Sequence, residues 1–166
     1  MVLTGASGAG KTTLLLKLAV VGLGGVECIN CDRVQVERPA SGDPSDYQSA
    51  ILQHWLDELR CRNNKVELAV LDTQIRPHRA IEVLGRAGVV SYEVVLVDCE
   101  PSVRNKRLLT ERQQPELVTA QMDCWAAYLR GQADALGLTI IDTSSQLVED
   151  SLEDLMSVVS KFFPTR

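Results

Sequence analysis

The chain has 166 residues, of which 45% are hydrophobic and 23% are charged, and its formal net charge is −5. This size and composition are typical of one globular domain, so we expect a single domain spanning 1–166. The negative charge argues against broad binding to nucleic acid or to an anionic membrane, and the aromatic content of 4% gives no sign of a base-stacking surface. We therefore expect no nucleic-acid partner and no membrane partner.

The cysteines suggest a reducing environment. There are five of them, scattered along the chain. Cys28 and Cys31 form a C-x-x-C pair, but no second such pair and no histidine pair completes a zinc site. We expect reduced, mostly buried thiols and a cytoplasmic protein without a signal peptide. No apolar run approaches the length of a membrane span.

A glycine-rich motif follows the first predicted strand, residues 1–4. That strand is short for a central parallel strand. Either the true start of the protein lies a few residues upstream, or the chain was trimmed. The motif reads Gly5-Ala6-Ser7-Gly8-Ala9-Gly10-Lys11-Thr12 and fits the pattern G-x-x-x-x-G-K-[ST]. Its glycines let backbone N–H groups surround a phosphate, Lys11 places a positive charge on the β- and γ-phosphates, and the Thr12 hydroxyl can bind Mg²⁺. The sequence therefore predicts a P-loop that binds a nucleoside triphosphate.

Strands and helices alternate along the rest of the chain. Apolar runs predict strands at 26–29, 65–71, 92–97 and 139–141, and helical spacing predicts helices at 11–21, 46–62, 77–87, 102–110, 115–136 and 152–163. Such alternation indicates a parallel sheet covered on both faces, with ligands at the carboxyl ends of the strands. Acidic residues follow four of these strands: Asp32, Asp72, Asp98 and Asp142. In the helix predicted from 115, we interpret Met122 and Trp125 as packing residues and Cys124 as a core residue.

Two of these carboxylates are candidates for chemistry. Asp32 can accept the proton of an acceptor hydroxyl or hold a Mg²⁺-bound water, and a helix cap or turn is its alternative role. Arg33 is a candidate for fixing an anionic acceptor, although a solvated arginine is an equally good interpretation. Asp72 closes the apolar run 68–71 in the form of a Walker B element, whose carboxylate reaches Mg²⁺ through water.

Polar and basic residues further along supply candidate substrate contacts. We expect Gln74 and Arg76 to project into the cleft as a hydrogen-bonding pair for a substrate, with ordinary loop polarity as the alternative. The densest basic stretch contains Arg104 and Arg107 on one helix face, followed by Arg112. Arginines on a mobile flap can close over a triphosphate and stabilise the transferring group, whereas a charge run is otherwise a solvated face.

Together these parts resemble the small P-loop kinases, namely the nucleoside-monophosphate, shikimate, gluconate and adenylylsulfate kinases and the chloramphenicol phosphotransferases. Proteins of this kind are often labelled AAA-family ATPases. The resemblance implies a three-layer α/β P-loop fold with a five-stranded parallel sheet, order 2-3-1-4-5, and a short lid at about 104–116. It also implies ATP and Mg²⁺ as ligands.

The resemblance further implies a role for each motif residue. Phosphates and Mg²⁺ would be held by Gly5, Ser7, Gly8, Ala9, Gly10, Lys11, Thr12 and Thr13. Asp32 would contact the acceptor hydroxyl, and Arg104, Arg107 and Arg112 would form the basic lid. The loop with Thr143 and Ser144 would pack on adenine. We expect Lys11, Asp32, Arg107 and Arg112 to act in catalysis, and Asp72 to join Thr12 at the metal.

Our leading hypothesis is an ATP-dependent kinase, a monomer or homodimer, that moves the γ-phosphate to a hydroxyl or phosphate group of a small molecule. Residues 74–77 match no acceptor signature, so the identity of the acceptor stays open. The alternative is a nucleotide-binding ATPase or GTPase switch that acts on a protein partner. A toxin-like kinase for a nucleotide sugar is a third interpretation, with nearly the same active-site parts.

Overall fold

A parallel sheet forms the centre of the computed structural model, which describes residues 1–62 and 66–163. Its five strands are β1 (Val2–Thr4), β2 (Val26–Asn30), β3 (Leu68–Asp72), β4 (Val94–Asp98) and β5 (Thr139–Asp142). All neighbouring strands are parallel, and their order is β2-β3-β1-β4-β5. The predicted sheet and its order are confirmed.

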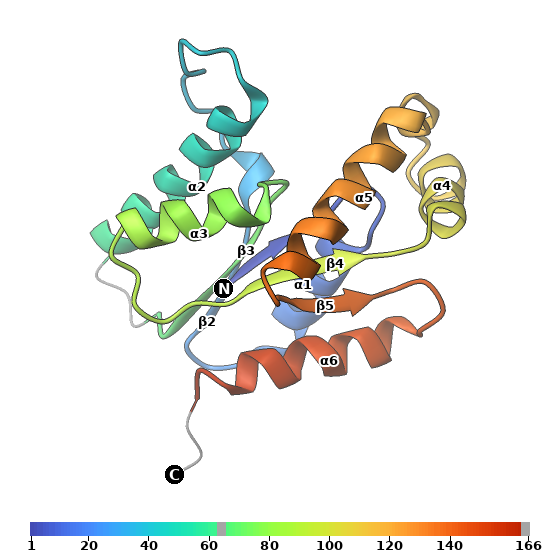
Figure 1. Ribbon diagram of the computed structural model, residues 1–166. Coiled ribbons are helices and arrows are strands. Elements are labelled where there is room, and N and C mark those ends of the chain that lie inside the picture. Colours follow the sequence, from blue (N-terminus) through green and yellow to red (C-terminus); the bar gives the residue numbers. More distant parts are fainter. Residues whose placement is uncertain (63–65, 164–166) are drawn as a thin grey trace.

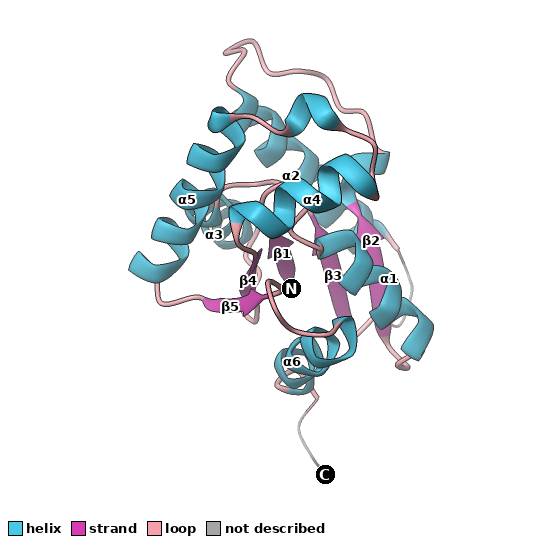
Figure 2. Ribbon diagram, turned by 90° about the vertical axis from the view of Figure 1, so that its right-hand side faces the viewer, coloured by secondary structure: helices cyan, strands magenta, loops and turns pink. Residues whose placement is uncertain are grey.

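Helices cover both faces of the sheet (Figures 1 and 2). One face carries α1 (Lys11–Val21) and α6 (Val148–Ser160), which pack on each other and on the strands. The opposite face carries α2 (Pro44–Cys61), α3 (Pro77–Arg86) and α5 (Ala120–Ala135). A further helix, α4 (Pro101–Thr110), lies beyond the carboxyl end of β4. The result is a three-layer α/β fold.

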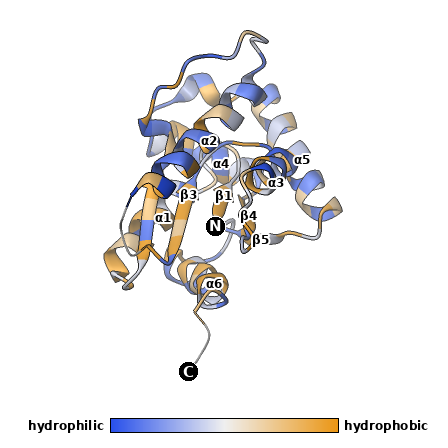
Figure 3. Cartoon of the chain, turned by 90° about the vertical axis from the view of Figure 1, so that its left-hand side faces the viewer, coloured by the Kyte–Doolittle hydropathy of each residue, from blue (hydrophilic) through white to orange (hydrophobic). Residues whose placement is uncertain are grey.

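The alternation of side chains along each strand divides the core into two parts. In β1, Leu3 packs with Leu14 and Leu155 of the α1 and α6 layer, whereas Val2 packs with Leu52 and Val83 of the opposite layer. Because both faces are buried, the strands are hydrophobic along most of their length, as Figure 3 shows. Each buried leucine or valine contributes about 1.5–3 kcal/mol to folding.

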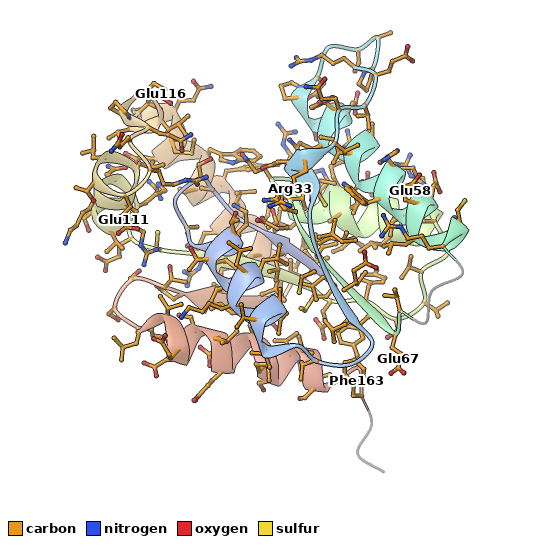
Figure 4. The ribbon with its side chains drawn as sticks, turned by 180° about the vertical axis from the view of Figure 1, so that it is seen from behind. Arg33, Glu58, Glu67, Glu111, Glu116 and Phe163 are labelled. Atoms are coloured by element: carbon orange, nitrogen blue, oxygen red, sulfur yellow. The ribbon has the colours of Figure 1, made fainter. Side chains whose placement is uncertain are left out.

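The register aligns the carboxyl ends of the strands at one edge. Asp72 pairs with Asn30 of β2, and Asp98 of β4 pairs with Asp142 of β5. Two projections rise from this edge in Figure 1. We call residues 34–61, which include α2, the first arm, and residues 101–128, which run from α4 into α5, the second arm. Glu67 and Phe163 lie at the opposite end of the molecule (Figure 4).

Several predicted boundaries are wrong. The helix predicted from 115 is a short 3-10 helix, Pro115–Leu117, followed by α5, because Thr119 caps α5 by accepting a hydrogen bond from the Met122 N–H. The last helix begins at Val148 rather than 152, and the helix predicted at 46–62 begins at Pro44, where Asp43 is the cap. The strand predicted at 65–71 begins at Leu68, and position 65 lies outside the described residues.

Within the described ranges, no helix combines the length and the apolar character that a bilayer crossing requires.

Candidate active site

The glycine-rich loop between β1 and α1 depends on backbone conformations that favour glycine. Gly5 has φ +149°, and a Cβ atom there would lie 2.1 Å from the carbonyl oxygen of Val97. Gly8 has φ +82°, and a Cβ atom there would lie 3.0 Å from Cγ of Arg104. The loop therefore lies directly against β4 on one side and α4 on the other, which leaves no room for a side chain at these two glycines.

Lys11 is the first residue of α1, and its side chain curls back under the loop. Its Nζ donates hydrogen bonds to the carbonyl oxygens of Gly5 at 2.8 Å and Ala6 at 3.1 Å, and the residue is 7% exposed. Burial lowers the pKa of Lys11, while the nearby carboxylates of Asp72 and Asp32 oppose that effect. An anion next to this ammonium group would favour its charged form.

Thr12, in the first turn of α1, and Asp72, the last residue of β3, lie next to each other. The Thr12 hydroxyl donates a hydrogen bond of 2.7 Å to Oδ2 of Asp72, which ends β3 and is buried. Burial raises the pKa of Asp72, whereas the charge of Lys11 and the Thr12 hydrogen bond lower it. A hydroxyl and a carboxylate on adjacent elements are oxygen ligands of the kind that Mg²⁺ prefers.

A cavity of about 410 Å³ lies beside this loop, and we call it the first cavity. It is lined by Gly8, Gly10, Lys11, Thr12, Thr13, Leu14, Leu16, Arg107, Glu111, Arg112, Thr143, Gln146, Val148 and Ser151. Helix α1 begins at its edge with no side-chain cap, so the N–H groups of its first turn are available to an anion. The uncapped helix, the ammonium group of Lys11 and the oxygens of Thr12 and Asp72 fit a magnesium-bound triphosphate.

Arg107 is tied to the loop rather than extended into the solvent. Its guanidinium donates to Oγ1 of Thr143 at 2.8 Å, to the Thr143 carbonyl at 2.7 Å and to the Gly8 carbonyl at 3.4 Å. The Thr143 hydroxyl donates in turn to the carbonyl of Ala9 at 2.8 Å. Arg107 and Thr143 therefore fix the carbonyl side of the loop, which turns its N–H groups toward the cavity.

The other two arginines of the basic segment have different environments. Arg104 is 1% exposed and pairs with Asp123 of α5, so it connects α4 to α5 instead of facing a phosphate. Arg112 is exposed, follows α4 and lines the first cavity. It lines this cavity together with Lys11, and its charge lowers the pKa of both Lys11 and Asp72. Arg112 is thus the arginine of this segment that is free to contact a ligand.

A larger cavity of about 910 Å³ lies between the two arms, and we call it the second cavity. Its lining residues are Pro44, Ser45, Gln48, Gln74, Arg76, Glu116, Leu117, Thr119, Gln121, Met122, Cys124, Trp125 and Tyr128. The end of β3 separates it from the first cavity, because Asp72 faces Thr12 while Gln74, two residues later, lines the second cavity.

Solved structures of small-molecule kinases share this architecture. The chain is similar to a shikimate kinase from Acinetobacter baumannii in complex with shikimate, with TM-score 0.59 and 19% identity over 99% of this chain and 94% of that chain. It is also similar to a gluconokinase from Sinorhizobium meliloti 1021 (TM-score 0.55, 13% identity, 98% and 96% covered) and to a deoxyadenosine kinase from M. mycoides with bound dATP (TM-score 0.51, 10% identity, 96% and 98% covered).

The chain has a small P-loop kinase-like fold. Its sequence matches no protein-family model and no curated protein. At these levels of identity the similarity establishes the fold and leaves the acceptor unassigned.

The kinase-like fold places the predicted residues in three groups. The first cavity brings together Gly8, Gly10, Lys11, Thr12, Thr13, Arg107, Arg112 and Thr143, and the second receives Gln74 and Arg76. The backbone of Gly5, Ser7 and Ala9 completes the loop. Ser144 does not line the first cavity; its hydroxyl donates to Asp142 and accepts a hydrogen bond from the N–H of Glu100 at 2.8 Å.

Asp32 and Arg33 lie in a short 3-10 helix, Cys31–Arg33, directly after β2. Both are exposed, and neither lines the first or the second cavity. Asp32 is close enough to Lys11 and Asp72 to raise the pKa of each, and Figure 4 shows Arg33 between the two arms. Their backbone is set by Asn30, whose side chain accepts a hydrogen bond of 3.0 Å from the N–H of Asp32.

The residues that sequence reasoning missed line both cavities, and they include Ser45 and Gln48 of α2 in the second cavity. Trp125 and Met122, interpreted as packing residues, line the second cavity together with Tyr128, which received no role. The three residues are spaced three apart in the sequence, which places them on one helix face, and this spacing could have indicated a shared surface. Gln146 and Val148 of the first cavity were missed because the start of α6 was predicted four residues late.

The expectation of mostly buried thiols is wrong. Cys31 and Cys99 are buried, Cys28 is half-buried, and Cys61 and Cys124 are exposed. Cys124 lines the second cavity instead of the core, because its neighbours Ala126 and Leu129 take the buried positions of α5. Burial raises the pKa of the Cys28, Cys31 and Cys99 thiols.

Proposed function

We propose that this protein is a Mg²⁺-dependent phosphotransferase that moves the γ-phosphate of ATP to a hydroxyl or phosphate group of a small molecule. The observation that carries the proposal is the second cavity, which opens at the same sheet edge as the P-loop cavity and on the other side of the end of β3. A nucleotide switch needs only the first of these cavities. A kinase needs both, because donor and acceptor must be bound side by side.

On the donor side, the loop N–H groups and Lys11 bind the phosphates. Arg112 is placed to neutralise the charge that develops on the transferring group. Thr12 and Asp72 would hold Mg²⁺, Thr12 directly and Asp72 through water, and the ion would supply positive charge that offsets the charge of the phosphates. Arg107 keeps the loop in its binding conformation through Thr143 and Gly8.

On the acceptor side, Asp32 is the proposed general base. For a hydroxyl acceptor, the acceptor oxygen forms a bond to the γ-phosphorus while the bond from that phosphorus to the β,γ-bridging oxygen breaks, and ADP leaves. Asp32 takes the hydroxyl proton and later releases it to water. Gln74 and Arg76 hold the remainder of the acceptor in the second cavity.

The proposal is tested by measuring ADP formation from Mg-ATP with a panel of nucleosides, nucleotides, sugars, sugar acids and aminoglycosides. We expect at least one acceptor class to stimulate ADP formation, and we expect Lys11→Ala to abolish the stimulation. Lys17→Ala is the matched control, because Lys17 lies on the same helix but pairs with Glu149 on the exposed side. A protein that binds ATP but shows no stimulation across the panel would contradict the proposal and favour the switch.

A further inference from the structure

Charge is sparse on the wall of the second cavity. Among its lining residues, only Arg76 and Glu116 carry a formal charge. Glu116 lies at the tip of the second arm in Figure 4. A doubly charged phosphate ester requires more than one cation, and a polyamine requires several carboxylates, because a buried charge without a partner is costly. The wall therefore favours a ligand that is neutral or carries a single charge.

One side of this cavity is an aromatic surface on α5. The rings of Trp125 and Tyr128 are stacked, with centroids 5.7 Å apart and an interplanar angle of 23°. Met122 precedes Trp125 by three residues and lines the same side. Tyr128 is 42% exposed and Trp125 is half-buried, so the aromatic surface is open to a ligand. A flat ring gains most from such a surface, through stacking and apolar burial together.

Arg76 lies over the two rings of the aromatic surface and has unused hydrogen-bonding capacity. Its guanidinium carbon lies 5.7 Å from the ring centroid of Trp125 and 5.6 Å from that of Tyr128. Its Nε is shielded from solvent without a hydrogen-bond partner, and Arg76 forms no ion pair among the residues that the structure describes. A ring carbonyl, a ring nitrogen or one carboxylate on a ligand would satisfy these donors.

The opposite side, on the first arm, offers neutral polar groups. Ser45 is 5% exposed, and its hydroxyl has no hydrogen-bond partner within the described part of the chain. Gln48 accepts a hydrogen bond of 3.3 Å from the Thr73 hydroxyl, which leaves its amide NH₂ available, and Gln74 also lines the cavity. The volume of about 910 Å³ is near the upper end of the range of ligand pockets, roughly 300–1,000 Å³.

We infer that the acceptor is a ring-bearing alcohol, neutral or singly charged, whose flat aromatic ring stacks on Trp125 and Tyr128. A hydrogen-bond acceptor on that ring faces Arg76, and neutral substituents meet Ser45 and the two glutamines. The inference rests on the proposed function, since it assumes that the second cavity holds the acceptor. Nucleosides and aryl alcohols share this chemistry, whereas a saturated polyhydroxy acid has no flat face to stack.

Fluorescence of single-tryptophan variants tests the inference without requiring turnover. The chain has two tryptophans. Trp55→Phe leaves Trp125 as the reporter, and Trp125→Phe leaves Trp55, which lines neither cavity, as the matched control. The probes are the four deoxynucleosides and coniferyl alcohol as flat ligands, with gluconate and shikimate as ligands without an aromatic ring. We expect at least one flat probe to quench Trp125 saturably and none to quench Trp55.

Two further variants sharpen the result. Tyr128→Ala and Arg76→Leu should each raise the Kd of the quenching probe about tenfold, the effect expected for the loss of one stacking partner or one charge-assisted hydrogen bond. Quenching by a nucleoside only or by the aryl alcohol only would each support the inference and identify the source. Equal quenching by gluconate or shikimate, or no quenching of Trp125 by any flat probe, would overturn it.

The outcomes separate this inference from the proposed function. If a flat probe binds at Trp125 but never stimulates ADP formation, the ring-binding site stands and the phosphotransferase proposal fails. If gluconate or another non-aromatic acceptor is phosphorylated and Tyr128→Ala leaves its KM unchanged, the phosphotransferase proposal stands and the ring-bearing acceptor is ruled out.

Discussion

Asp32 and Asp72 lie near the same lysine but differ in exposure, so substitutions of the two residues should have different effects on activity. Asp32→Asn should lower kcat about 100-fold or more while the Kd of ATP changes little, because a general base acts on the acceptor proton. Asp72→Asn should instead raise the Mg²⁺ concentration needed for half-maximal activity, because its carboxylate faces Thr12. Steady-state kinetics at several Mg²⁺ concentrations measure both effects. Equal losses of kcat and ATP affinity in Asp32→Asn would argue against the base.

Substitutions of Arg107 and Arg112 should likewise have different effects, the first on stability and the second on catalysis. Arg107 donates hydrogen bonds to Thr143 and Gly8, so Arg107→Ala should destabilise the protein by about 2–3 kcal/mol. Arg112 is exposed, so Arg112→Ala should leave the melting temperature unchanged and lower kcat about 1,000-fold. Thermal unfolding and kinetics of both variants test the assignment. A melting temperature that falls for Arg112→Ala and not for Arg107→Ala would reverse it.

At the scale of elements, α4 connects the P-loop to α5 through a buried arginine. The side chain of Arg104 packs directly against Gly8, where a Cβ atom would lie only 3.0 Å from Cγ of Arg104. The guanidinium of Arg104 pairs with Asp123. Asp123 is two residues before Trp125, so the same contact reaches the helix that lines the second cavity. The first and second cavities thus share one structural support.

Asp123→Asn should therefore destabilise the protein more than the loss of an ion pair on the surface does. It leaves the buried guanidinium of Arg104 without its counter-charge, which we expect to destabilise the protein by about 3 kcal/mol and to lower the melting temperature by about 6–12 °C. The double variant Arg104→Met/Asp123→Asn should recover part of that loss, because it removes the buried charge. Asp134→Asn, which breaks an exposed pair with Arg130 on the same helix, is the matched control. A loss for Asp123→Asn no larger than that of the control would contradict the dependence of the buried Arg104 on Asp123.

The elements also show what the sequence could and could not predict. The strands and the P-loop followed from local patterns, because apolar runs and the glycine spacing depend on neighbouring residues, whereas the strand order came from the resemblance to small P-loop kinases. The environment of Arg104 did not, since its burial depends on Asp123, which is nineteen residues away. The break between Pro115 and Ala120 was missed because the cap at Thr119 is a single residue within an otherwise helical pattern.

At the scale of the whole molecule, the second cavity forms only when the two arms stand on the same sheet edge. Its wall combines Ser45 of the first arm with Trp125 of the second, and no local pattern relates these residues. The sequence therefore predicted Gln74 and Arg76 as substrate residues but left out the aromatic side. The assignment of all these residues to substrate binding stays a prediction.

Thiol labelling reports on occupancy of this cavity. Cys61 and Cys124 are exposed, whereas burial raises the pKa of Cys31 and Cys99, so the exposed pair should react first with a disulfide reagent at pH 8. An acceptor at ten times its Kd should slow the modification of Cys124 about tenfold and leave Cys61 unaffected. Mass spectrometry of the labelled peptides gives both rates. Equal slowing at Cys61, or no slowing at Cys124, would place the acceptor elsewhere.

The central claim is that the γ-phosphate reaches an acceptor rather than water. The most direct measurement incubates the protein with Mg-ATP labelled in the γ-phosphate and an acceptor that binds the second cavity, then locates the label. We predict that the label appears covalently on the acceptor, in proportion to the ADP formed, and that Lys11→Ala abolishes the transfer. Label that is recovered only as inorganic phosphate or remains on ATP, although ATP and the acceptor both bind, would contradict the claim.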